Sequence, residues 1–203
     1  MNKYYKQFLE LIRNPKYKSL WNVFLFMLIT YSFHLLWRRF SIEINSVKII
    51  SNASLFLADQ VFVWSEWFNR RILNLDFYII DPNTFIFPSV NGYIAIVESC
   101  GGMKQMYQVF FLFMLFPGPW KHKLWYIPLS FFIMYLTNVL RIIALSIIIL
   151  IIPDYWDFSH DWILRPFFYV VLFGLWVFWV EFIVNPNNSK FYYKFFKRKV
   201  SEE

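Results

Sequence analysis

The only cysteine among 203 residues stands where a nucleophile would be useful. Cys100 follows an alternating β-branched stretch at 93–99 and precedes Gly101, Gly102 and an apolar helix that begins at Met103. The unpaired N–H groups and the dipole at a helix N-terminus favour thiolate over thiol. The backbone N–H groups of the two glycines would suit an oxyanion hole for a thioester-forming intermediate. The alternative is a small buried apolar side chain, which is common for a free cysteine.

A second candidate is an arginine inside an apolar run. A guanidinium in hydrocarbon costs ~2.5–3.5 kcal/mol unless it is paired or hydrated, so Arg141 marks a function by default. Asn138 lies one helical turn earlier on the same face and would support it. Arg141 would stabilise a thiolate, an oxyanion or a substrate carbonyl. The structural alternative is an ion pair with Glu98, Asp59 or Glu66, or a side chain that reaches the membrane surface.

A third candidate is a histidine in an acidic, aromatic segment that we expect to be a loop, at 153–161. His160 would act as the general base that activates Cys100 and then protonates the leaving amine. Asp157 and Asp161 flank it, and either one would orient the ring. The alternative is a solvated loop histidine without a chemical role.

Other kinds of site lack support in the sequence. The single cysteine and the histidines are scattered without metal-ligand spacing, and HExxH, Gly-rich phosphate-loop and GxSxG patterns are absent. We therefore expect neither a metal nor another cofactor. No nucleic-acid-binding motif accompanies the basic residues, so the net charge of +7 does not indicate a nucleic-acid partner.

Composition predicts an integral membrane protein. Hydrophobic residues make up 59% of the chain and aromatic residues 24%, and several apolar runs approach bilayer length. We expect one predominantly α-helical, polytopic membrane domain over residues 1–203, with about four or five transmembrane helices. Lysines and arginines crowd both ends of the chain, which suits an anionic cytoplasmic membrane surface.

The predicted elements follow from hydropathy and turn signals. Residues 53–73 read as an amphipathic helix. Its four charges favour a position at the interface or packed inside the protein, and a membrane span is the alternative. Two turn signals divide residues 76–99 into a small antiparallel β unit, which must lie outside the hydrocarbon or against protein. Apolar helices are expected at 20–37, 103–116, 124–152 and 162–184.

The topology brings the three candidates to one depth. With the basic N-terminus inside, the loop with Lys121 and Lys123 and the basic tail are also inside, as the positive-inside rule requires. The β unit, Cys100 and His160 then fall on the extracytoplasmic side. Arg141 lies 17 residues beyond Leu124, or roughly 26 Å along a helix that starts inside, so it approaches the same boundary.

Three short motifs in this order resemble those of the exosortase/archaeosortase family: Glu98–Met103, Asn138–Ile142 and His160. The resemblance covers residues 75–180, and the chain looks like a compact form of the family. One departure is Gly101, where the family usually has Ser or Ala. We divide the single domain into an N-terminal anchor with an amphipathic helix (1–74), an exosortase-like core (75–184) and a basic cytoplasmic tail (185–203).

The resemblance implies a membrane-embedded cysteine transpeptidase or endopeptidase with a Cys–Arg–His set, here Cys100, Arg141 and His160. Its substrates would be exported proteins with a C-terminal sorting signal, which consists of a short motif, a transmembrane helix and a basic cluster. The implied location is a bacterial inner membrane with the active site on the periplasmic side. The competing hypothesis is a non-enzymatic scaffold for surface-protein or exopolysaccharide export. A transporter is disfavoured because the sequence has no internal repeats.

Overall fold

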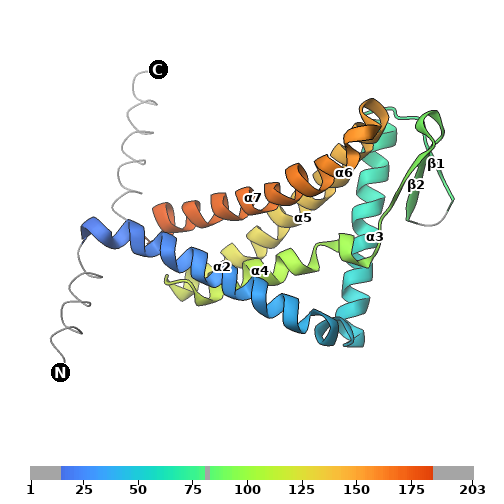
Figure 1. The fold of residues 1–203 in the computed structure, drawn as a ribbon. Helices are drawn as coiled ribbons and strands as arrows, with labels where there is room; N and C mark the ends of the chain where they lie inside the picture. Colours follow the sequence, from blue (N-terminus) through green and yellow to red (C-terminus); the bar gives the residue numbers. More distant parts are fainter. Residues whose placement is uncertain (1–14, 81–82, 185–203) are drawn as a thin grey trace, which may run out of the picture.

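The computed structural model describes residues 15–80 and 83–184 (Figure 1). The predicted basic tail at 185–203 and most of the basic N-terminal head lie outside the described residues. Five longer helices form the framework: α2 (Pro15–Asn45), α3 (Lys48–Arg71), α4 (Met103–Leu115), α5 (Trp120–Ile151) and α7 (Arg165–Phe178).

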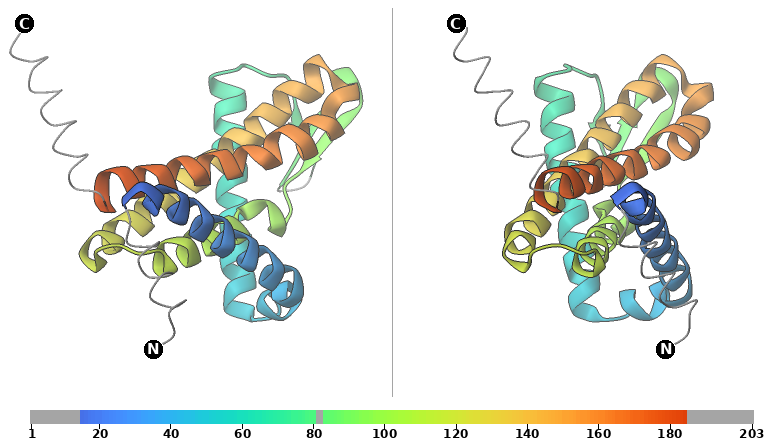
Figure 2. Two further views of the ribbon diagram at one scale, coloured as in Figure 1. Left: turned by 60° about the vertical axis from the view of Figure 1, so that its left-hand side comes forward. Right: turned by 90° about the vertical axis from the view of Figure 1, so that its left-hand side faces the viewer.

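Four of these helices run lengthwise in alternating directions, and α3 crosses them near one end (Figures 1 and 2). Helix α3 packs mainly on α5 and on η2 (Glu98–Gly101), a one-turn 3₁₀ helix. The beginning of α2 and the last turns after α7 lie at the opposite end of the bundle (Figure 1). The segment that carries Cys100 is therefore held between α3 and the lengthwise helices.

Three stretches of the described chain are long and apolar enough to cross a membrane: Ser19–Asn45, Trp120–Ile151 and Pro153–Val184. Helix α4 has 13 residues, which extend only ~20 Å and fall short of a ~30 Å hydrocarbon core. Three candidate spans in the described residues are fewer than the predicted four or five, so that count stays a prediction. Helix α3 is longer than the predicted 53–73 and packs one face on α5 and η2, and its placement relative to the membrane stays a prediction.

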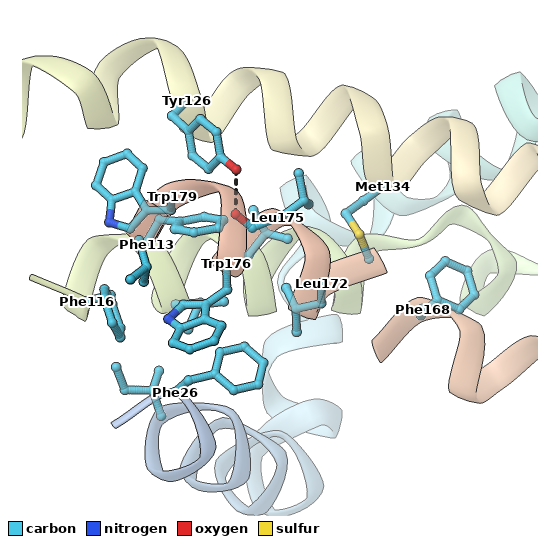
Figure 3. Close-up of a cluster of buried hydrophobic side chains, with 14 residues drawn as sticks. Phe26, Phe113, Phe116, Tyr126, Met134, Phe168, Leu172, Leu175, Trp176 and Trp179 are labelled. Carbon is cyan, nitrogen blue, oxygen red and sulfur yellow. Dashed lines mark hydrogen bonds between the residues drawn. The ribbon is translucent and has the colours of Figure 1, made fainter. Parts of the chain in front are cut away.

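An aromatic cluster holds α2, α4, α5 and α7 together (Figure 3). Trp179 is wholly buried and donates a hydrogen bond from Nε1 to the carbonyl of Pro117, at 3.2 Å. Tyr126 donates from its hydroxyl to the carbonyl of Leu175, at 2.6 Å. Rings bury a large area, and these two also satisfy their polar tips. The members of this cluster that Figure 3 labels are Phe26, Phe113, Phe116, Tyr126, Met134, Phe168, Leu172, Leu175, Trp176 and Trp179.

A buried lysine closes the turn between α4 and α5. Lys123 donates from Nζ to the carbonyls of Met114 and Phe116, each at 2.9 Å. Those carbonyls belong to the C-terminal end of α4, where no further helical N–H is available to them. The lysine therefore caps α4 while its stem is buried.

The predicted β unit is present as a three-stranded antiparallel sheet in the order β1-β2-β3. It consists of β1 (Tyr78–Ile79), β2 (Thr84–Phe87) and β3 (Gly92–Ala95), with the 3₁₀ turn η1 (Pro88–Val90) between the last two. One face of the sheet packs on α3 and α5 through buried side chains that include Phe85 and Ile94. The predicted last strand ran to residue 99, but β3 ends at Ala95 and Cys100 lies in the η2 turn instead.

The segment around His160 is helical, so the predicted loop at 153–161 is wrong. The chain passes through η3 (Pro153–Tyr155), α6 (Trp156–Phe158) and the π-helical turn η4 (Ser159–Leu164) into α7, and ends in a second π turn, η5 (Trp179–Val184). Pro166 gives a reason for the wide η4 turn, because a proline removes a backbone donor and its ring displaces the preceding carbonyl. The last helical stretch therefore begins well before Trp162.

Candidate functional site

A single cavity is lined by all three of the candidate side chains Cys100, Arg141 and His160. We call this cavity the thiol pocket. Its volume is about 530 Å³, within the range of ~300–1,000 Å³ that is usual for ligand sites. Its wall is formed by four regions, namely β3 with the turn before it, Cys100 in η2, the second half of α5, and the segment from Pro153 to His160.

Cys100 is held by backbone contacts on both sides. Its N–H donates to the carbonyl of Val97 at 2.8 Å, which closes the η2 turn. Its carbonyl accepts a hydrogen bond from the side-chain amide of Asn138 on α5. The thiol is half-buried and free. Asn138 thus fixes the cysteine turn against the helix that also carries Arg141. Its predicted support of Arg141 in the reaction stays a prediction.

Gly101 and Gly102 have packing reasons to be glycine. A Cβ on Gly101 would lie 2.6 Å from the carbonyl oxygen of Ser54 on α3. Gly102 has φ of 82°, and a Cβ there would lie 3.1 Å from the amide nitrogen of Asn138. Both glycines are buried, and neither lines the thiol pocket as the structure describes it. Their predicted service as oxyanion donors stays a prediction.

Arg141 is a half-buried cation beside the thiol. Its guanidinium interacts with the Cys100 side chain and lies over the ring of Phe168, 5.5 Å from the ring centroid. Its Nε is buried and has no hydrogen-bond partner among the described residues. Each polar group that water no longer reaches costs ~1–3 kcal/mol when unpaired. This nitrogen is therefore an unsatisfied donor within the described part of the chain.

The ion pairs that would make Arg141 merely structural are not formed within residues 15–80 and 83–184. Glu66 pairs instead with Arg70 at 3.2 Å. Asp59 accepts a hydrogen bond from Asn83 at 2.8 Å. One carboxylate oxygen of Glu98 is buried without a partner.

His160 is oriented by two neighbours. It donates from Nδ1 to Oδ1 of Asp161 at 2.7 Å. Trp156 stacks on the imidazole with ring centroids 5.2 Å apart and planes only 2° from parallel. The side chain of His160 is 24% exposed. The bond to Asp161 uses Nδ1, so the other ring nitrogen, Nε2, is the atom at which the ring would exchange a proton. The choice between Asp157 and Asp161 as hydrogen-bond partner thus falls on Asp161, although Asp157 lines the pocket.

Positive charge gathers around this end of the bundle. Arg165 binds Asp161 at 3.2 Å and lies within electrostatic reach of Arg141. Lys104, in the first turn of α4, has its pKa lowered by burial and further by the charge of Arg165. Asp161 is the carboxylate that contacts both the imidazole and Arg165. A reaction that develops negative charge here would meet several cations.

Sequence reasoning missed two residues of the site. Trp156 lines the pocket, and its indole nitrogen is buried without a partner among the described residues. Arg165 anchors Asp161. Each lies four residues from its neighbour in the site, and helical spacing would have indicated both had the 153–161 segment been predicted helical.

Two further observations concern metal ligands and a second cavity. Within residues 15–80 and 83–184, no three His, Cys, Asp or Glu side chains gather as metal ligands would. A larger groove of about 720 Å³ lies between α2, the start of α3 and α4, and its wall is almost wholly apolar. Cys100, Arg141 and His160 are absent from the residues that line that groove.

The comparisons with known proteins agree with the motif resemblance. A family model for transmembrane exosortases matches residues 14–177, which is most of the chain. No curated protein and no solved structure matches it. The match includes all three motifs, the residues that line the thiol pocket and all of α2, α4 and α5 with nearly all of α7. The chain therefore belongs to the transmembrane exosortase family.

Proposed function

We propose that this protein is a membrane-embedded cysteine transpeptidase or endopeptidase with Cys100 as its nucleophile. The observation that carries the proposal is the thiol pocket, where a free thiol, the guanidinium that interacts with it and an oriented imidazole line one cavity. These are the nucleophile, the electrostatic stabiliser and the acid–base group that acyl transfer requires. Family membership supports the same class of enzyme.

In the first half of the reaction, the Cys100 sulfur attacks a substrate peptide carbonyl and a C–S bond forms. The thiol proton moves to Nε2 of His160, while Asp161 holds the ring and stabilises the imidazolium. The guanidinium of Arg141 stabilises the negative oxygen of the tetrahedral intermediate. The C–N bond then breaks, His160 returns the proton to the leaving amine, and a thioester remains on Cys100.

In the second half, an acceptor nucleophile attacks the thioester carbonyl and its proton passes to His160. The C–S bond breaks and the thiol is restored. With water as acceptor the enzyme is an endopeptidase, and with an amine it is a transpeptidase. Thr, Ser and Cys nucleophiles in general use this division of one difficult step into two easier ones.

We infer the substrate class from the family and from the position of the site. The substrates are exported proteins that end in a short motif, a transmembrane helix and a basic cluster, and the enzyme acts on the periplasmic side of a bacterial inner membrane. Arg141 is embedded in α5, one of the candidate spans, and the thiol pocket also takes residues from the segment that starts the next candidate span. A motif that emerges from the bilayer beside its own helix would meet the thiol at this level.

The test is processing of such a signal-bearing protein in cells that make this chain. With the wild type we expect the protein to lose its C-terminal segment, and with Cys100→Ser or Cys100→Ala we expect it to stay full length. His160→Gln should also abolish processing, whereas His122→Gln should leave it unchanged, because His122 is exposed and bonds Trp125 far from the pocket. Processing that survives loss of the thiol contradicts the enzyme and favours the scaffold.

A further inference from the structure

One wall of the thiol pocket is an unpaired strand edge. Strand β3 is at the end of the sheet, and β2 pairs with only one of its two edges. All of the residues of β3 line the pocket together with Cys100, Arg141 and His160. From Ala95 the chain continues directly to the cysteine turn. The strand edge therefore leads along the pocket wall toward the thiol.

The hydrogen-bond phase of the sheet shows which backbone groups are unused. The N–H of Ile96 donates to the carbonyl of Asn83 at 2.8 Å. In an antiparallel pair, alternate residues direct both backbone groups toward the partner strand. The register pairs Phe85 with Ile94, so Ile94 faces β2 in the same phase as Ile96.

Tyr93 and Ala95 consequently direct their N–H and C=O groups to the free edge. No side chain or backbone group in the described parts of the chain bonds to these four groups outside the sheet. Exposed strand edges are usually protected by lysine, proline or a bulge, because they pair readily with another strand. Residues 92–95 contain none of these. The edge therefore has free backbone donors and acceptors and no protecting residue, so it can pair with another strand.

We propose that the thiol pocket binds its substrate as an extended peptide added as a further strand to the free edge of β3. Backbone groups of Tyr93 and Ala95 would bond alternate residues of that peptide, in the manner of other strand-addition complexes. This inference rests on the proposed function, since it takes a peptide carbonyl as the group that Cys100 attacks. Main-chain bonds would align the peptide along β3, and the pocket would select its side chains.

The geometry gives strand addition a particular consequence for reactivity. A peptide on the β3 edge lies in a fixed register, so only one of its carbonyls reaches the sulfur. Successive amides of a strand point to opposite edges, and only every second N–H of the bound peptide faces β3. Blocking alternate amides should therefore have alternate effects.

The experiment measures alkylation of Cys100 by acetyl-Ala-Ala-Ala-Ala-chloromethyl ketone, in which the sulfur displaces chloride and a C–S bond forms. The chain has one cysteine, and peptide mapping by mass spectrometry, with Cys100→Ser as the blank, assigns the adduct to this thiol rather than to His160. We compare the parent probe with versions N-methylated at the first, second or third amide, and iodoacetamide serves as the control for intrinsic thiol reactivity. The full-length protein is used in detergent micelles.

We expect the parent probe to react with Cys100 faster than iodoacetamide does, once each rate is divided by the rate of the same reagent with a free thiol. N-methylation at the first and at the third amide should change the alkylation rate alike, and N-methylation at the second should have the other effect. One of these two sets should lower the rate about fivefold, as expected for the loss of one or two hydrogen bonds, and the other should leave it unchanged. Equal rates for all methylated probes would overturn strand addition. So would a peptide probe with no advantage over iodoacetamide once their intrinsic reactivities toward a free thiol are divided out.

A matched pair of variants tests the contribution of the β3 backbone. Ala95→Pro removes the N–H that faces the free edge, and proline is tolerated on edge strands. Ala95→Ser keeps that N–H at the same exposed position. The first should lose the peptide-probe advantage about fivefold. Both should keep the wild-type rate with iodoacetamide, which shows that the reactivity of the thiol is unchanged, and the wild-type unfolding midpoint, which shows that the fold is intact. Equal peptide rates for the two variants would contradict the proposal.

These outcomes are distinguishable from failure of the proposed function. If Cys100 is not the enzyme's nucleophile, processing in cells survives Cys100→Ser whatever the probes show. If strand addition alone is wrong, processing still requires Cys100 while probe labelling ignores N-methylation and the Ala95 variants.

Discussion

The aromatic cluster and the thiol pocket share helix α5 but differ in how their side chains are used. In the cluster, Trp179 and Tyr126 are buried with their polar tips bonded to carbonyls of other segments. In the pocket, Arg141 and Trp156 keep buried nitrogens without partners among the described residues. An unpaired buried donor costs ~1–3 kcal/mol. Trp176 in the cluster also keeps an indole nitrogen without a partner among the described residues, so an open donor alone does not mark a site. The pocket differs because its open donors belong to residues that line a cavity together with a thiol and an imidazole.

The largest expected effect on stability is in the aromatic cluster. Trp179→Ala should destabilise the protein by about 3–5 kcal/mol, because it removes a wholly buried indole and leaves a cavity. Trp64→Ala is the control, since that ring is 52% exposed, and it should cost less than ~1 kcal/mol. Thermal unfolding in detergent measures both. Equal effects of the two changes would contradict the stabilising role of the cluster.

In the pocket, loss of a charge should affect activity and spare stability. Arg141→Gln should slow processing by about 10²–10³-fold, the usual effect of losing one oxyanion donor. The unfolding midpoint should stay level or rise, because a membrane-embedded charge is itself costly. Arg38→Gln, an exposed arginine on α2, is the control for charge alone and should process normally. A fall in the unfolding midpoint of Arg141→Gln matching that of Trp179→Ala would make Arg141 structural.

Substitution of the two aspartates near His160 tests whether a hydrogen bond to the imidazole matters more than a carboxylate nearby. Asp161→Asn should slow processing by about 10–100-fold, because it weakens a charge-assisted hydrogen bond to the imidazole. Asp157→Asn should have a smaller effect, since Asp157 lines the pocket and has no bond to His160 among the described residues. Rates measured with the same signal-bearing protein check this order. The reverse order would identify Asp157 as the orienting residue.

The smallest expected effect concerns the glycine that starts α4. Gly102→Ala should cost about 1–2 kcal/mol of stability, because φ of 82° is unfavourable for a residue with a Cβ. Gly174→Ala is the matched control: nothing lies within 4 Å of its added Cβ, and alanine in a helix should gain about 0.5–1 kcal/mol. Unfolding midpoints compare the two. A neutral Gly102→Ala would show that the turn before α4 relaxes freely.

Much of this architecture follows from the sequence, because long apolar runs and turn residues leave few choices. The runs around Arg141 and after Trp162 predicted membrane-length helices, and Asp81-Pro82 predicted the hairpin of β1 and β2. The convergence of Cys100 with Arg141 followed from counting helical rise between charged boundaries. That inference needed only the alternation of the chain across the membrane.

What escaped prediction depends on tertiary contacts. The helix through His160 has no periodicity strong enough to outweigh its acidic, aromatic composition, so the segment read as a loop. The burial of Gly101 against Ser54 depends on how α3 crosses the bundle, which no local pattern encodes. The free edge of β3 likewise needed the sheet order. These features position the site, and they follow from packing between segments far apart in the chain.

The most direct test of the account is capture of the thioester that Cys100 is proposed to form. A signal-bearing protein is processed by the purified enzyme in the presence of hydroxylamine, and the N-terminal product is analysed by mass spectrometry. We predict that the wild type releases this product as a hydroxamate and carries a transient adduct on Cys100, and that Cys100→Ser yields neither. A product that forms without an adduct, or a hydroxamate that also forms with Cys100→Ser, would contradict the central claim.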